Sequence, residues 1–248
     1  EIETGNYYSN MGLSNGEIAA LSRSMHKSQG FGNTGSRGSQ TEYLEFLKGD
    51  FPVNKANLFD GIDTTWSRIE GGKEIGLILY DLEKNFNFKE PSFMIPKLLE
   101  AYELILNLPQ EHWKTIKLKE IKKIIADCLG LYIEAVADQQ NAVRNGEVKI
   151  TIEAINRTNT DIELGSINST FISFPATLKP YKLEKNKKIV IESVVGTFNY
   201  KNYSAPYWLN EKGTKGMYQV SDKNNIGLPE KTMNFPITFQ LTINGKNL

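Results

Sequence analysis

The stretch EVKITIEA, residues 147–154, decides how this chain is divided. Every second residue from Val148 to Ala154 is apolar, and the residues between them are charged or hydroxylated. Successive side chains of a strand point to opposite faces, so this alternation predicts a strand with one buried and one solvated face. Before residue 146, apolar residues recur at helical spacing instead. We therefore predict an α+β chain: a mainly helical part over residues 1–145, followed by an antiparallel β-sandwich over residues 146–248.

Further strands are predicted in the C-terminal part. Residues 237–243 alternate apolar and polar side chains, and the following Asn244-Gly245 is a hairpin turn signal. Residues 170–174 and 189–195 are rich in Ile, Val and Phe and are separated by polar turns. Short strands at this spacing predict a sandwich of about 100 residues.

The N-terminal part carries four predicted helices. Residues 14–17, SNGE, have the spacing of a capping box, with Ser14 as N-cap and Glu17 reaching back. That helix should run to Gly30, with Ile18, Leu21 and Met25 on one face. Apolar stripes predict three more helices, over residues 75–86, 95–106 and about 115–139. The last contains Gly130, which destabilises a helix interior by about 1 kcal/mol.

Composition excludes several classes of function. Twenty-nine Lys and Arg balance 29 Asp and Glu, so we expect no nucleic acid or anionic membrane as a partner. The longest apolar stretch, residues 124–137, contains two acidic residues and is too short for a membrane span. Cys128 is the single cysteine, which excludes an intrachain disulfide and a thiolate zinc site. The only histidines, His26 and His112, are too far apart to form a zinc-binding motif.

A glycine-rich stretch, residues 30–39 (GFGNTGSRGS), has three interpretations. It matches the dinucleotide fingerprint G-x-G-x-x-G, but that fingerprint follows a strand, and a helix is predicted here. It also suits a helix C-cap followed by a loop with positive φ. The interpretation that we favour is a wall of a polar substrate pocket, since such a loop leaves many backbone N–H groups accessible.

Residues 16–32, GEIAALSRSMHKSQGFG, resemble the segment that closes the deacetylase domain of PIG-L (LmbE-like) proteins. The core of that pattern is an Ala-bearing helix ending in His-x-Ser/Thr-Gln, which His26 and Gln29 match. The glycine-rich loop and residues 59–68, FDGIDTTWSR, resemble the long Bacteroidetes-type members, which continue into a helical region and a β-sandwich. The resemblance is specific over residues 14–68 and rests on architecture beyond them.

The resemblance implies a zinc-dependent hydrolase that removes the acetyl group from an N-acetylglucosamine-type amine, with zinc activating a water. Family members take their metal ligands from a His-Pro-Asp-Asp motif and a later His-x-x-His, and this chain contains neither. We therefore expect the C-terminal portion of a deacetylase, with no catalytic residue, metal site or cofactor of its own. Its expected partners are the missing catalytic domain, which would hold zinc, and a glycan or amino sugar. The expected location is periplasmic or extracellular.

Five residues are candidates for contact with substrate. His26 and Gln29 come from the family pattern, although a lone histidine is more often a hydrogen-bonded structural residue. Arg37, Trp66 and Arg68 suit sugars and phosphates, because a guanidinium binds oxyanions and an indole face stacks on a pyranose. Trp66 has an equally weighted alternative as a core or interdomain anchor. Without the rest of the domain, we expect the glycine-rich loop to be mobile or repacked.

A second aromatic group is formed by Tyr200, Tyr203, Tyr207 and Trp208. It predicts either a sugar-stacking platform or, more often, a sandwich edge packed on the helices. Two function classes therefore stay open: an accessory region of a deacetylase that orients a glycan, and a binding module whose β-sandwich holds carbohydrate or protein.

Overall fold

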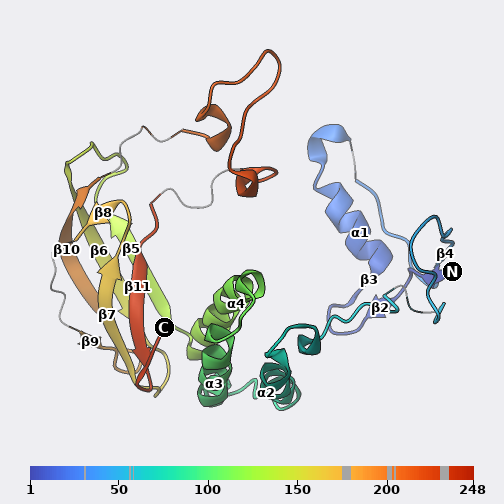
Figure 1. The fold of residues 1–248 in the computed structure, drawn as a ribbon, viewed down its shortest axis with the longest axis horizontal. Coiled ribbons are helices and arrows are strands. Elements are labelled where there is room, and N and C mark those ends of the chain that lie inside the picture. The colour runs from blue at the N-terminus through green and yellow to red at the C-terminus, as the bar shows by residue number, and fades with distance from the viewer. Residues whose placement is uncertain are drawn as a thin grey trace. The chain divides into compact units, whose positions relative to one another are not determined.

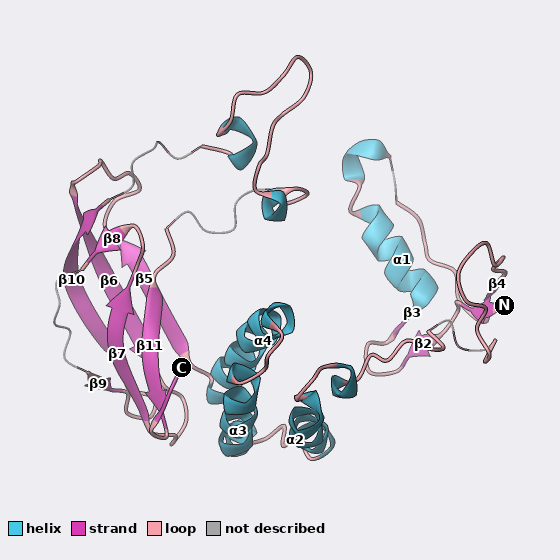
Figure 2. Ribbon diagram, in the orientation of Figure 1, coloured by secondary structure: helices cyan, strands magenta, loops and turns pink. Residues whose placement is uncertain are grey.

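The computed structural model describes residues 1–30, 32–55, 57, 59–174, 180–199, 203, 205–229 and 235–248. These residues form two compact units, Glu1–Thr64 (unit 1) and Thr65–Leu248 (unit 2), drawn in Figure 1 and by secondary structure in Figure 2. Both units contain helices and antiparallel strands, so the α+β class is confirmed. The expected boundary at residue 145 lies inside unit 2 and stays a prediction.

Unit 1 consists of short pieces. Strands β1 (Ile2–Glu3) and β4 (Thr41–Glu42) pair, as do β2 (Tyr7–Tyr8) and β3 (Leu13–Ser14), and both pairs are antiparallel.

Helix α1 (Asn15–Ser24) begins as the sequence predicts. The Glu17 N–H donates to Ser14 Oγ at 3.3 Å, and the Ser14 N–H donates to Glu17 Oε2 at 3.0 Å. This reciprocal capping satisfies two otherwise unpaired donors of the first turn. The helix stops at Ser24, short of the predicted Gly30, and a 3₁₀ turn, η1 (Lys27–Gln29), follows. Gly30 closes that turn with a φ of 73°, in the left-handed region that glycine tolerates.

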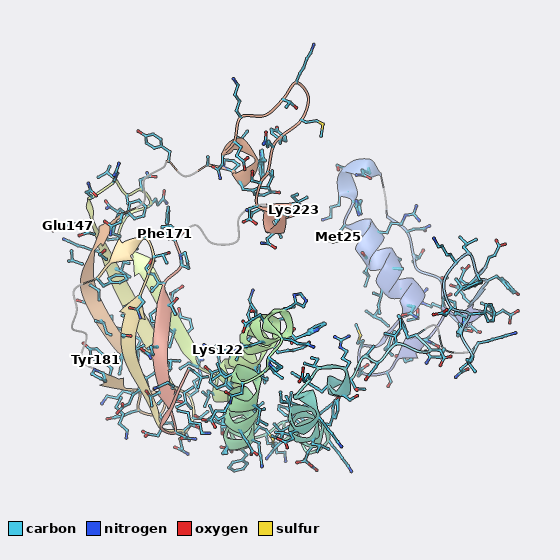
Figure 3. The ribbon with its side chains drawn as sticks, in the orientation of Figure 1. Met25, Lys122, Glu147, Phe171, Tyr181 and Lys223 are labelled. Atoms are coloured by element: carbon cyan, nitrogen blue, oxygen red, sulfur yellow. The ribbon has the colours of Figure 1, made fainter. Side chains whose placement is uncertain are left out.

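Most of the large apolar side chains described in unit 1 are exposed. Among the residues described in unit 1, the side chain of Ser14 is the only one that is buried. On the predicted apolar face of α1, Ile18 is half-buried, whereas Leu21 is 58% exposed and Met25, labelled in Figure 3, is 74% exposed. Other large exposed side chains in unit 1 are Tyr7, Tyr8, Met11, Tyr43, Leu44, Phe46, Leu47, Phe51, Val53, Phe59 and Ile62. The described residues of unit 1 therefore form no buried hydrophobic core of the kind on which a domain of this size depends.

Unit 2 opens with helices. They are α2 (Gly72–Lys84), α3 (Ile95–Leu106) and α4 (Glu111–Leu129), with 3₁₀ turns η2 (Trp66–Arg68) and η3 (Pro91–Met94). Helices α2 and α3 occur where apolar stripes predicted helices, over residues 75–86 and 95–106. Those stripes lie in the core, where Ile75, Leu82, Leu98, Leu99 and Ile105 are buried.

The prediction of one helix over residues 115–139 was wrong. Helix α4 ends at Leu129, because Gly130 adopts a left-handed conformation (φ 55°) and the Leu131 N–H donates back to the Ala126 carbonyl. This is the glycine-dependent way of ending a helix. The next residues form strand β5 (Tyr132–Ala137), which pairs antiparallel with residues 150–155.

Two four-stranded antiparallel sheets complete unit 2. The first has the order β5, β6 (Glu147–Ile155), β10 (Ile189–Phe198), β8 (Ile172–Ser173). The second has the order β12 (Lys246–Asn247), β11 (Thr238–Ile243), β7 (Ile162–Asn168), β9 (Tyr181–Lys182). The predicted alternation of β6 is confirmed, since its four apolar residues from Val148 to Ala154 are buried. Strand β7 was not predicted.

The helices and sheets of unit 2 contribute to one cluster of buried hydrophobic residues. Polar contacts join them as well: the Lys246 ammonium pairs with the Glu103 carboxylate at 2.5 Å, and the Arg157 guanidinium donates to the Gly130 carbonyl at 2.6 Å. Helical turns also occur after residue 146, as η4 (Tyr207–Leu209) and η5 (Lys223–Asn225), so helix is not confined to the N-terminal part.

Candidate functional site

The glycine-rich loop lies against the start of helix α1. A Cβ atom on Gly35 would lie 2.5 Å from the Gly16 carbonyl oxygen, and one on Gly16 would lie 2.6 Å from the Ser36 carbonyl oxygen. Neither position has room for a side chain, so glycine is required on both sides of this contact. The loop is therefore packed against α1 within unit 1. Phe31 lies outside the described residues.

Arg37 is held at the same place. Its Nε lies 2.7 Å from Glu17 Oε1, and its side chain is 67% exposed. The pair links the loop to the capping box of α1, while most of the guanidinium stays open to solvent. A surface ion pair of this kind contributes little to stability.

A depression of about 650 Å³ borders Arg37. Its lining consists of Glu3, Gly5, Asn6, Tyr7, Gly12, Ser14, Glu17, Arg37, Gly38 and Ser39. The glycine-rich stretch of residues 30–39 is predicted to form a pocket wall, and of its described residues Arg37, Gly38 and Ser39 line this depression.

Both carboxylates of the depression are occupied as hydrogen-bond acceptors. The Ser39 hydroxyl and the N–H groups of Gln40 and Gly5 donate to Glu3 and lower its pKa. The Ser14 N–H and hydroxyl, and then Arg37, lower the pKa of Glu17. A general acid or base works best with a pKa near the working pH, and these shifts go the other way. The depression thus offers two ionised, hydrogen-bonded carboxylates, which suits polar binding.

His26 and Gln29 occupy the turn that follows α1. His26 precedes η1, its carbonyl accepts from the Gln29 N–H at 3.0 Å, and its own N–H donates to the Arg23 carbonyl at 3.1 Å. Both residues are exposed. The segment before Gly30 is helical, and residues 32–38 are not, so the strand and helix of a dinucleotide fingerprint are absent from these residues.

Trp66 anchors η2 to helix α2. A Cβ atom on Gly72 would lie 2.2 Å from the Trp66 carbonyl oxygen, and one on Gly76 would lie 2.9 Å from Trp66 Cβ. The Trp66 N–H also donates to the Tyr80 hydroxyl at 3.2 Å. Its ring is partly buried against the core, so the structure favours the anchor that the sequence left as an alternative.

Arg68 stacks on a ring of helix α4. Its guanidinium carbon lies 4.2 Å from the centre of the Trp113 ring, and the Lys117 ammonium lies 5.7 Å from the Trp66 ring. Such cation–π contacts stabilise by about 0.5–1 kcal/mol at exposed sites. Trp66 and Arg68 are thus brought together on one face of α4. Trp113 and Lys117 were not predicted as their partners, although the i, i+4 spacing of these two residues on a helix indicates that they share a face.

The five predicted site residues are divided between the two units. His26, Gln29 and Arg37 belong to unit 1, whereas Trp66 and Arg68 belong to unit 2. Their role as substrate contacts stays a prediction.

The second aromatic group occupies a long loop. Tyr207 and Trp208 form η4 with their rings 4.9 Å apart, and Tyr203 is 97% exposed. Tyr200 lies outside the described residues.

Within the described ranges, no group of three His, Cys, Asp or Glu side chains is placed to hold a metal ion. In the same ranges, each helix is too short or too polar to cross a bilayer. The sequence matches no protein-family model, and a search of curated proteins finds no significant relative.

Proposed function

We propose that this chain is the C-terminal portion of a PIG-L-like N-acetylglucosaminyl deacetylase and that it packs on the catalytic domain and helps to orient its substrate. The resemblance of residues 14–68 supports this assignment. In this proposal, unit 1 completes the catalytic domain, and the two sheets of unit 2 face each other as a β-sandwich. The single cluster of buried side chains that both sheets share supports the sandwich.

The observation that carries the proposal is the exposed apolar surface of unit 1. Covering one large apolar side chain stabilises by about 1.5–3 kcal/mol, and unit 1 leaves such side chains exposed along its length. Contiguous exposed apolar surface marks an interaction site. A catalytic domain lying on unit 1 would bury Leu21 and Met25 and give α1 the apolar environment that its stripe requires.

Zinc does not fit the residues described here, since they hold no suitable set of ligands. In this proposal the metal and its bound water belong to the catalytic domain, which supplies the chemistry. Arg37, with an exposed guanidinium at the depression, is the residue of this chain best suited to bind a substrate oxygen. We propose a periplasmic or extracellular location for the whole enzyme.

The reading frame upstream of residue 1 tests the proposal. A His-Pro-Asp-Asp codon run within a few hundred codons supports it, and the longer protein should then release acetate from N-acetylglucosamine glycans while the 248-residue chain does not. In the longer protein, Arg37→Ala should lower kcat/KM by about ten- to a hundredfold, because a charge-assisted hydrogen bond contributes roughly 1.5–3 kcal/mol. A frame without the motif, or acetate release by this chain alone, would overturn the proposal.

A further inference from the structure

Residues 205–229 form a loop that is closed by its own hydrogen bonds; Figure 3 labels one of its residues, Lys223. The Tyr207 hydroxyl donates to the Leu228 carbonyl at 2.7 Å and joins the two ends of the loop. Inside that closure, the Ser221 N–H and hydroxyl donate to the two oxygens of Glu211 at 2.8 and 2.7 Å. These hydrogen bonds preorganise the loop in the absence of a ligand, and preorganisation lowers the entropic cost of binding.

A hollow of about 460 Å³ lies within the loop. The residues that line it include Trp208, Tyr218, Glu211 and Thr214. Gly213 lets the chain fold back closely, since a Cβ atom there would lie 2.7 Å from the Met217 carbonyl oxygen. The volume lies within the range of about 300–1,000 Å³ that is usual for small-molecule sites.

The hollow combines two kinds of surface. Tyr218 is 67% exposed and the neighbouring Met217 is 72% exposed, so the loop displays apolar groups instead of burying them. Glu211 supplies an acceptor, and the two hydrogen bonds from Ser221 lower its pKa and keep it ionised. Aromatic side chains beside an ionised hydrogen-bond acceptor suit a ligand with an apolar face and a rim of hydroxyl groups.

We propose that this hollow is a saccharide-binding site. Trp208 and Tyr218 contact the C–H faces of the sugar rings, and Glu211 accepts hydrogen bonds from sugar hydroxyls. Of the two function classes that the sequence leaves open, this site supports the carbohydrate-binding module and places its ligand in residues 205–229. It does not depend on the deacetylase assignment, because all of its residues lie in residues 205–229.

Calorimetric titration of the whole 248-residue chain with cellotetraose and with tetra-N-acetylchitotetraose tests the site. At least one saccharide should bind saturably, with a Kd of about 0.1–1 mM. Trp208→Ala should weaken that binding at least about tenfold, Trp208→Phe should restore part of it, and Glu211→Gln should weaken it about three- to tenfold.

Tyr203→Ala is the matched control, because Tyr203 is 97% exposed and does not line the hollow. It should bind as the wild type does, and unchanged circular dichroism should show that every variant is folded. The absence of saturable binding of both saccharides, or equal affinity in folded Trp208→Ala, would overturn the site. Binding that persists although the upstream frame lacks a zinc motif would leave the site standing and remove only the deacetylase proposal.

Discussion

Asn156, at the end of β6, offers the sharpest test of how unit 2 is held together. Its side chain is 1% exposed and uses all four of its hydrogen-bonding positions. Nδ2 donates to the carbonyls of Thr160 at 2.9 Å and Leu183 at 3.0 Å, and Oδ1 accepts from the Thr158 N–H at 2.9 Å and hydroxyl at 3.0 Å. The side chain thereby fixes the turn that leads from the first sheet toward the second.

Asn156→Ala should lower the free energy of unfolding by about 2.5–6 kcal/mol. The bond to Leu183 is buried, and leaving such a group unpaired costs about 1–3 kcal/mol, while each of the three part-buried bonds adds roughly 0.5–1 kcal/mol. Urea unfolding followed by tryptophan fluorescence measures this effect, since Trp66, Trp113 and Trp208 all lie in unit 2. Asn168→Ala, which removes one exposed hydrogen bond, is the matched control and should change stability by less than about 0.5 kcal/mol.

Asn156→Asp separates hydrogen bonding from packing. The new carboxylate would keep the bonds from Thr158 but would face two carbonyl oxygens without a proton to donate, so its pKa in the folded state should be raised. A raised pKa means that the folded state holds the proton more tightly, so this variant should gain stability as the pH falls from 7 toward 5. A loss below about 1 kcal/mol for Asn156→Ala, or wild-type stability of Asn156→Asp at pH 7, would refute the reasoning.

The remaining predictions concern the loop, the η2 segment and pH. Gly35→Ala should displace the loop from α1 and shift the backbone NMR resonances of Gly16 and Glu17, whereas Gly32→Ala, where a Cβ meets nothing within 4 Å, should leave those resonances unchanged; equal behaviour of the two variants would contradict the close contact. Arg68→Ala should lower the stability of unit 2 by about 0.5–1 kcal/mol in urea titrations while Arg68→Lys retains part of that contribution, and an unchanged midpoint in Arg68→Ala would rule out a stabilising stack on Trp113. Because the pKa of Glu17 is lowered on folding, its contribution is present above its unfolded pKa and lost as the pH falls through the folded value. The protection factor of the Ser14 amide, which corrects for the intrinsic pH dependence of exchange, should therefore fall only in acid, and a fall near neutral pH would show that the capping carboxylate is not held ionised.

Elements that depend on neighbours in sequence were predictable. The capping box of α1 needs only the spacing of Ser14 and Glu17, and the Asn244-Gly245 turn needs only two residues that accept a positive φ, observed at 48° and 78°. The sequence also predicted helices α2 and α3 from their apolar stripes and strand β6 from its alternation, because each amphipathic period fits one kind of backbone. Of the candidate site, the sequence indicated Arg37 and its loop as one side of a depression, but it did not reveal that Glu17 pairs with Arg37.

Elements that depend on distant partners were decided by the tertiary structure. The apolar stripe from Ile121 continues through Tyr132 at helical spacing, so the sequence favoured helix there; pairing of β5 with residues 150–155 makes that segment a strand. Strand β7 was not predicted because a bulge between Leu164 and Ile167 breaks the alternation of apolar and polar residues. Its pairing with β11 in the folded chain identifies it as a strand. The roles of Trp66 and Arg68 likewise depend on α2 and α4. Caps, turns and periodicity arise from contacts within a few residues, whereas strand pairing and side-chain stacking require segments that only the folded chain brings together.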